Sequence, residues 1–421
     1  MAESEFAFHV GVDWGAEQHQ VCILDAAGGA VDEIKVAHQG AAIRALCQRL
    51  LGLAPAAQVA VAIESPASPV TEPLLECGLA VHAVNPKQLD RFRDRHFPAG
   101  SKDDRRDSFV LATSLRTDPH CFRRLDPQDP ALLDLRALVR LDQTLKADLR
   151  AYCNRLRDSL LLTFPQILEL SAAADEPWIW GLLELAPAAP QAALLSLARL
   201  RSLLRRHRIR RVSPEDLWRK LRQPALPLPA ASFQRSARQV RSLLPLVRAL
   251  AAQVRANAQA MQACLDQLAA PEPAGGDRGQ HRDAAILLSL PGMGPMVAAT
   301  MLAEAPAALR ERDYHALRAY AGMAPITRQS GKSRLVAMRR ACSRPVREAV
   351  YHWSRISMMR DPAAKAHYAR LRARGHSHGR ALRGLADRQL QMLCAMLRHR
   401  QLYDPCRRSP PPDPADNPSH P

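Results

Sequence analysis

The first part of the chain alternates between short apolar runs and stretches in which apolar residues recur every three or four positions. The short runs are rich in Val, Ile and Ala and predict strands over 6–13, 20–25, 31–37, 58–63 and 81–84. The stretches with helical spacing predict helices over 41–53, 71–77 and 103–116. Three consecutive strands followed by alternating helix and strand are the order of an α/β RNase H-like (RuvC-like) fold, which we expect for residues 6–125.

Leucine dominates the helical patterns farther along the chain. It recurs every three or four residues from 130 to 164, which predicts a long helix with a candidate coiled-coil seam, and a second long helix is predicted over 232–269. Prolines interrupt the segment between these helices, and a Pro/Gly-rich linker spans 271–276. We therefore expect a helical connector, a mainly α C-terminal domain and a disordered tail rich in Pro and Ser, over 126–270, 281–402 and 403–421.

The charge of the chain narrows the class of partner. Lys and Arg number 59 against 41 acidic residues, which leaves a net charge of +18. An excess of this size favours a polyanion such as DNA or RNA as the binding partner. The alternative is that the composition reflects a GC-rich genome, in which Arg replaces Lys. The nine cysteines form no CxxC pair, no basic signal sequence precedes the first strand, and no apolar run is long enough to cross a membrane. These features predict a cytoplasmic protein with no membrane partner.

Four carboxylates stand where they can meet at one edge of the predicted sheet. Asp13 and Glu64 each end an apolar run, while Asp104 and Asp107 lie three residues apart on a predicted helix. Acids in this arrangement hold Mg²⁺ against a nucleic-acid phosphate in nucleases and related enzymes. Taken singly, Asp13 or Glu64 is explained equally well as a helix cap, and the acids near 104 as a solvated helix start. Asp103 is interpreted as a bystander.

Two segments of the C-terminal region also carry candidate functional residues. Gly292 and Gly294, between an apolar turn and an Ala-rich stretch, predict a helix-hairpin-helix whose backbone N–H groups approach a DNA phosphate. An ordinary connection between two helices is the alternative. Ser330 precedes a glycine in a basic loop, and its hydroxyl is a candidate nucleophile on phosphorus, although most Ser-Gly pairs are simply turns. Candidate phosphate-binding cations in this loop are Arg328, Lys332 and Arg334.

Together these segments resemble the insertion-sequence transposases of the IS110 family, which are DEDD recombinases with a C-terminal serine. The matching segments occur in the family's order across nearly the whole chain, and they are Gly11-Val12-Asp13, Ile63-Glu64-Ser65-Pro66, Asn85-Pro86-Lys87-Gln88, Lys102-Asp103-Asp104-Arg105-Arg106-Asp107, Leu290-Pro291-Gly292-Met293-Gly294-Pro295, Gln329-Ser330-Gly331-Lys332 and Tyr351-His352-Trp353. Asp103 and Ser108 depart from the commoner family residues, but neither departure removes a metal ligand. The stretch from about 166 to 230 is longer than a minimal member needs, and nothing in the sequence assigns it a role.

The resemblance implies a function for the acids and the serine. Asp13, Glu64, Asp104 and Asp107 look like the DEDD acids that hold Mg²⁺, and Ser330 looks like the serine that attacks DNA and forms a covalent phosphoserine link. The resemblance further implies a guide RNA as well as DNA, and a homo-oligomer (dimer or tetramer) that joins acid and serine sites across protomers. Two alternatives stay open: a metal-dependent nuclease of the Holliday-junction-resolvase type in which Ser330 is only a turn residue, and a non-catalytic nucleic-acid-binding protein.

Overall fold

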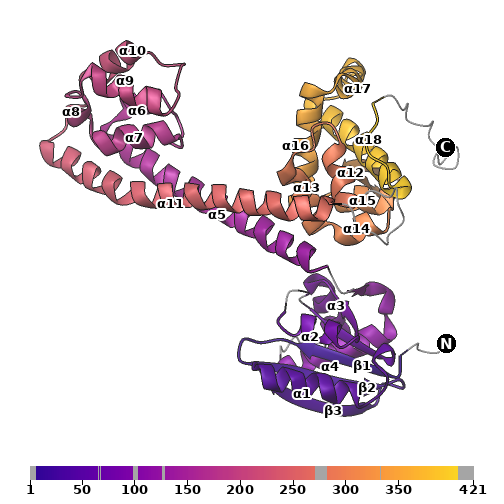
Figure 1. Cartoon of the computed structure of the whole chain (residues 1–421). Coiled ribbons are helices and arrows are strands. Elements are labelled where there is room, and N and C mark those ends of the chain that lie inside the picture. The colour runs from indigo at the N-terminus through magenta and orange to yellow at the C-terminus, as the bar shows by residue number, and fades with distance from the viewer. Residues whose placement is uncertain are drawn as a thin grey trace. The chain divides into compact units, whose positions relative to one another are not determined.

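The computed structural model describes residues 6–64, 66, 68–97, 103–125, 129–270, 282–331 and 333–405. The chain divides into two units, Met1–Asp129 and Pro130–Pro421 (Figure 1). The predicted linker over 271–276, Lys332 and the tail from Cys406 onward lie outside the described residues.

The first unit is built on one mixed six-stranded sheet with the order β3-β2-β1-β4-β5-β6. Its strands are β1 (Phe8–Asp13), β2 (Gln18–Asp25), β3 (Ala30–Ala37), β4 (Val59–Ile63), β5 (Ala80–Ala83) and β6 (Arg123–Arg124). The first three strands pair antiparallel, β1, β4 and β5 run parallel, and β6 returns antiparallel to β5. The first five strands lie where the sequence predicts them, and the mixed α/β sheet agrees with the predicted α/β class, whereas β6 was not predicted.

Helices cover both faces of this sheet. They are α1 (Gly40–Leu51), α2 (Thr71–Glu76), α3 (Pro86–His96) and α4 (Asp104–Thr117), with short 3-10 turns at Ala56–Gln58 and Pro119–Cys121. Helix α3 is absent from the elements predicted from the sequence. In the structure, Asn85 accepts a hydrogen bond from the backbone N–H of Lys87, and Pro86 occupies the first turn of the helix. Asn followed by Pro is a known start signal for helices.

Side-chain size along the central strands decides which helix packs on which face. Alternate residues of β4 point to opposite faces of the sheet. Val59, Val61 and Ile63 belong to the core beneath α1 and α2, whereas Ala60 and Ala62 belong to the core beneath α3 and α4. On the neighbouring strand β1, Gly11 is the small residue on this same face of the sheet. A Cβ at Gly11 would lie 1.9 Å from the carbonyl oxygen of Ser108 in α4. The close approach of α4 to β1 therefore requires glycine at this position.

We expect Gly11→Ala to destabilise the protein by about 3 kcal/mol or more, because the added methyl forces α4 away from the sheet. Denaturant unfolding measures the change in the free energy of unfolding. Gly40→Ala is the matched control, since a Cβ at Gly40 meets no atom within 4 Å. Equal stabilities of the two variants would contradict the close packing of α4 on β1.

Two long antiparallel helices organise the second unit: α5 (Pro130–Thr163) and α11 (Ala230–Ala269). The Cys264 thiol donates to the carbonyl of Ala131 (3.3 Å) and the Asn257 amide donates to the carbonyl of Leu138 (2.9 Å). Farther along, the hydroxyl groups of Ser159 and Ser236 lie 3.1 Å apart. Residues with higher numbers in α5 thus contact residues with lower numbers in α11, so the two antiparallel helices lie side by side over most of their length. Both helices begin and end close to the bounds that the sequence predicts.

Separate groups of short helices pack near the two ends of the α5/α11 pair (Figure 1). One group is α6 (Pro165–Leu168), α7 (Pro177–Leu185), α8 (Ala189–Ala192), α9 (Leu197–Arg206) and α10 (Pro214–Leu221). The other is α12 (Asp283–Ser289), α13 (Pro295–Glu304), α14 (Pro306–Arg310), α15 (Tyr314–Tyr320), α16 (Arg344–Arg360), α17 (Pro362–Ala373) and α18 (His378–His399). Each group shares one hydrophobic core with α5 and α11, so the C-terminal region is mostly helical, as predicted.

No strand is predicted from the sequence in the C-terminal domain, but β7 (Pro325–Ser330) and β8 (Ser333–Met338) form an antiparallel hairpin. The hairpin has no strongly apolar face, which explains why the alternation of buried and exposed residues that reveals most strands is absent. In the part of the chain that is described, no helix has the length and apolar character needed to span a bilayer.

Candidate metal centre and serine hairpin

The four predicted acids come from three neighbouring elements of the first unit. Asp13 is the last residue of β1, and Glu64 directly follows β4. These strands are parallel, with Val12 opposite Ile63, so the next residue of each chain emerges at the same edge of the sheet. Helix α4 begins at Asp104 and packs on β1, which places its first turn, including Asp107, beside that edge.

The electrostatics of Asp13 show that the acids influence one another. Burial and then the negative charges of Asp107, Asp104 and Glu64, in that order, together raise the pKa of Asp13 to about 7, while the positive charge of Arg93 opposes them. Carboxylates that share a site disfavour one another's ionised form in this way. The structure therefore brings Glu64, Asp104 and Asp107 within electrostatic reach of Asp13.

Arg93 of α3 is a functional candidate that the sequence analysis missed. Its guanidinium pairs with both carboxylate oxygens of Asp107, with Nη2 2.9 Å from Oδ2, and Asp107 is only 2% exposed. Arg93 also contacts Asp90 on its own helix. The helix start signal at Asn85 and Pro86 would have predicted α3, but the long-range pairing with Asp107 has no signature in the sequence.

The acids fit a divalent cation by the chemistry of their donor atoms. Carboxylate oxygens are the ligands that hard divalent ions prefer. The raised pKa of Asp13 shows that the negative charge of the neighbouring acids exceeds what Arg93 neutralises. Among the described residues, no three His, Cys, Asp or Glu side chains already stand close enough to share an ion. Binding would therefore require the carboxylates to turn inward, and Asp107 would have to share or leave its pairing with Arg93.

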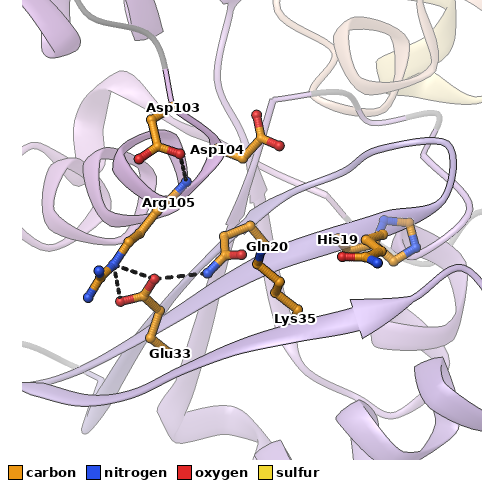
Figure 2. A pocket seen from close by; sticks show the side chains of 8 residues that line it. His19, Gln20, Glu33, Lys35, Asp103, Asp104 and Arg105 are labelled. Atoms are coloured by element: carbon orange, nitrogen blue, oxygen red, sulfur yellow. Dashed lines mark hydrogen bonds and ion pairs between the residues drawn. The ribbon is translucent and has the colours of Figure 1, made fainter.

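A hollow of about 410 Å³ opens beside Asp104, between the β2–β3 side of the sheet and the start of α4 (Figure 2). Its lining is polar and consists of Gln18, His19, Gln20, Glu33, Lys35, Asp103, Asp104 and Arg105. Glu33 accepts hydrogen bonds from Gln20 and Arg105, whereas Asp103 accepts one from the backbone N–H of Arg105 at 3.3 Å. Asp103 is thus a helix cap, in agreement with its interpretation as a bystander.

Ser330 is exposed at the end of β7, where the hairpin turns. The basic segment around it was expected to be a loop. It instead consists of two paired strands, because Ser330 lies opposite Ser333 and Gly331 adopts the left-handed conformation (φ 53°) that a tight turn requires. Alternate residues share a face of a hairpin, so Arg328 lies on the same face as Ser330, whereas Arg334 lies on the opposite face. Lys332 lies outside the described residues.

The two glycines of the predicted helix-hairpin-helix differ in their surroundings. Gly292 has φ 79°, and a Cβ there would lie 2.7 Å from the backbone nitrogen of Ser357 in α16. The same turn is fixed by hydrogen bonds from Trp353 (3.0 Å) and Ser357 (2.7 Å) to the carbonyl of Pro291. Packing on α16 therefore already explains Gly292. Gly294, at the start of α13, has open space where a Cβ would stand, so it is the glycine that a phosphate can approach.

Comparison with known proteins assigns the chain to a family. Residues 10–165 match a family profile described as "Transposase", specific to DEDD transposases of the IS110 type, and residues 284–369 match one described as "Transposase IS116/IS110/IS902 family". The two profiles cover the segments that contain the predicted acids and Ser330.

Individual relatives agree with these matches. A mini-circle putative transposase for IS117 from Streptomyces coelicolor is 31% identical over 96% of this chain and 97% of its own length. An uncharacterised 43.6 kDa protein of insertion element IS110 from the same organism is 28% identical over 94% of the chain and 95% of its length. The putative transposase y4uE of Sinorhizobium fredii is 41% identical over 48% of the chain, a match that spans 57% of that relative. The chain therefore belongs to the IS110 family of transposases, enzymes that act on DNA.

Proposed function

We propose that the protein transposes an insertion sequence by cutting and rejoining DNA strands, with the four acids holding Mg²⁺ and Ser330 as the nucleophile. The acids belong to the first unit and Ser330 to the second, so their cooperation in one site is part of the proposal. The observation that carries it is the gathering of Asp13, Glu64, Asp104 and Asp107 at one sheet edge in a chain whose second family-specific segment presents an exposed serine.

The reaction would be an exchange of phosphodiesters. The Oγ of Ser330 attacks the phosphorus of the scissile phosphate and forms a serine–phosphate ester. The bond from phosphorus to one DNA oxygen breaks, the Ser330 hydroxyl gives up its proton, and the departing oxygen takes up a proton and leaves as a hydroxyl. A hydroxyl from another DNA end then attacks the phosphoserine, which rejoins the DNA and releases Ser330. One ester replaces another at each step, so no ATP is needed.

The remaining residues position and neutralise the phosphate. Mg²⁺ held by the acids would supply charge neutralisation and orientation of the scissile phosphate. Arg93 holds Asp107 in place at the buried end of the acid cluster. Arg328, on the same hairpin face as Ser330, would donate to the non-bridging phosphate oxygens, and Lys332 and Arg334 would contact neighbouring phosphates. The amide of Gly294 would approach DNA at the start of α13.

Arg328 and Arg334 lie on opposite faces of the β7–β8 hairpin, so their substitution should affect DNA cleavage to different extents. We expect Arg328→Ala to slow strand cleavage by about 100-fold, because it removes a guanidinium on the side of the nucleophile. Arg334→Ala removes the same charge from the opposite face, and we expect it to lower activity by less than about 10-fold. Single-turnover cleavage of labelled DNA measures both rates. Similar losses in the two variants would contradict the assigned faces of the hairpin.

A trapping experiment tests the proposed function. Protein is incubated with Mg²⁺, RNA transcribed from the element's non-coding end and end-labelled DNA carrying the element ends, and the products are separated under denaturing conditions. We expect labelled DNA that stays attached to protein after denaturation and is released by protease. Cleaved DNA without any such adduct would favour the metal-dependent nuclease, and uncut DNA would favour the non-catalytic alternative.

The resemblance to the family extends the proposal to partners. It includes a guide RNA in addition to DNA, and a homo-oligomer in which acids of one protomer serve the Ser330 of another. Mixing Asp13→Asn protein with Ser330→Ala protein tests the second part, since restored adduct formation requires that intact acids and an intact serine come from different chains.

A further inference from the structure

Helices α6–α10 have no role in the proposed chemistry, although they form a folded body whose hydrophobic core they share with α5 and α11. They pack around α5 and α11 through a cluster that includes Trp178, Leu203 and Val247. Gly181 lets α7 approach α9, because a Cβ there would lie 2.9 Å from Leu203. This body therefore presents a defined surface rather than a loose insertion.

The acids of this body are nearly all neutralised within the protein. Every acidic residue between 165 and 229 except Asp175 takes part in an ion pair, and the pairs are Glu169–Lys220, Glu176–Arg211, Glu184–Arg248, Glu215–Arg201 and Asp216–Arg219. Arg222 stacks on the ring of Trp218, 3.8 Å from its centroid. Within residues 165–229, all of which the structure describes, the exposed arginines that neither take part in an ion pair nor stack on an aromatic ring are Arg199, Arg205, Arg206, Arg208 and Arg210.

These five arginines lie close together on α9 and the turn that follows it. At about 100° per residue, Arg199, Arg205 and Arg206 fall within one arc of the helix, opposite the buried leucines. Ala198 and Ser202 lie at the centre of this arc, so only small side chains separate the flanking guanidinium groups. A helix of this kind brings its backbone close to a chain of phosphates while the arginines reach the phosphates on either side.

The turn after α9 holds an arginine in a conformation that usually selects glycine. Arg208 has φ 54°, and the backbone N–H of Ile209 returns to the carbonyl of Leu204 at 2.9 Å, which closes the helix end. Ile209 packs against the core and fixes the turn. Cations at the end of a helix are favourable for its dipole, which accounts for Arg205 and Arg206 but not for Arg199, Arg208 or Arg210. The helix dipole alone therefore does not explain the cations at positions 199, 208 and 210.

We propose that Arg199, Arg205, Arg206, Arg208 and Arg210, here called the α9 arginine face, bind the phosphate backbone of duplex DNA at a surface that is separate from the acids and from Ser330. DNA is the partner because the chain belongs to a family of DNA transposases, so the inference rests on that membership and not on the serine chemistry. The contacts reach phosphates only, which predicts binding without sequence preference and with a steep dependence on salt.

A charge-matched pair of variants tests the α9 arginine face. The first is Arg205→Gln/Arg206→Gln/Arg210→Gln, and the control is Arg201→Gln/Arg211→Gln/Arg219→Gln, which removes three arginines of the same body that are already in ion pairs. Fluorescence anisotropy with a labelled duplex of arbitrary sequence, in EDTA so that no cleavage occurs, measures affinity between 50 and 200 mM salt. At about 100 mM salt we expect the first variant to bind at least 10-fold more weakly, with a salt slope smaller by about 2 to 3.

The control should lose less than about 3-fold in affinity, since its guanidinium groups are already engaged. Equal losses in the two variants, or no loss in the first, would overturn the proposal. A loss confined to a duplex RNA of the same sequence would also overturn it, because the surface would then recognise RNA. Ser330→Ala protein should bind like wild type, which separates a failure of this surface from a failure of the serine mechanism.

A single substitution gives an independent check. Arg208→Gly relieves the left-handed backbone, so we expect a slightly higher Tm together with about 3-fold weaker DNA binding. Stronger or unchanged binding by this variant would contradict a role of the Arg208 side chain in holding DNA.

Discussion

Asp13→Asn is expected to abolish strand cleavage, with a loss of at least about 1,000-fold, and at the same time to stabilise the metal-free protein at neutral pH. Activity is lost because Asp13 stands at the centre of the four acids and would be a ligand of the divalent ion. Stability rises because the pKa of Asp13, raised to about 7 by burial and by Asp107, Asp104 and Glu64, makes its ionised form unfavourable in the folded state.

The pH dependence of this effect has a definite sign. The folded protein keeps the Asp13 proton to about pH 7, whereas an unfolded chain releases it near pH 4. The stability that this carboxyl contributes is therefore complete below about pH 4 and is lost as the pH rises through about 7. After allowance for partial exposure, we expect the Asp13→Asn variant to be more stable than wild type by about 2 kcal/mol at pH 8 and equal to it near pH 4.

Thermal unfolding in EDTA at several pH values measures this difference in stability. Asp118→Asn is the control, because its effect on stability should have the opposite sign. The pKa of Asp118 is lowered, first by a hydrogen bond from Thr117 and then by Arg95, so its charge is favourable in the folded state. That variant should be slightly less stable than wild type above the carboxyl pKa. A lower Tm for Asp13→Asn at pH 8 would contradict the crowding of the four acids.

Ser330→Ala is expected to eliminate the covalent adduct and recombination completely while leaving the fold unchanged. Ser330 is exposed at the end of β7, so its hydroxyl contributes little to packing, and its loss removes only the proposed nucleophile. Denaturing gels of labelled DNA measure the adduct, and joined products measure recombination.

Ser333→Ala is the matched control for this prediction. Ser333 lies directly opposite Ser330 in the hairpin and is also exposed. Its substitution by Ala therefore also removes one serine hydroxyl beside the same turn. We expect near-normal adduct formation from this variant. An adduct that persists in Ser330→Ala would exclude Ser330 as the attacking group.

The acids could be predicted from the sequence because their placement follows from local rules. Asp13 and Glu64 end apolar runs, and parallel neighbouring strands bring such ends to one edge of a sheet. The start of α4 follows from the acids and helical spacing around Asp104. The resemblance added Ser330, whose role no local pattern indicates.

What the sequence could not provide depends on contacts between distant residues. Arg93 reaches Asp107 across 14 positions from a helix whose start signal was overlooked. Gly292 was interpreted as a phosphate-binding glycine, but its contact with Ser357, 65 residues later, gives it a packing role. The β7–β8 hairpin was missed because neither of its faces is strongly apolar, so it lacks the hydrophobic alternation from which strands are predicted.

If Ser330 carries the DNA during recombination, mass spectrometry of the trapped adduct will find the DNA attached to this residue. Trypsin cleaves after Arg328 and Lys332 and releases the peptide Gln329-Ser330-Gly331-Lys332, in which Ser330 is the only hydroxyl residue. After nuclease trimming, we predict this peptide with one attached nucleotide phosphate, and its absence from Asp13→Asn reactions. A nucleotide attached to any other peptide, or DNA that is cut and joined without any attached peptide, would exclude Ser330 as the residue that carries the DNA.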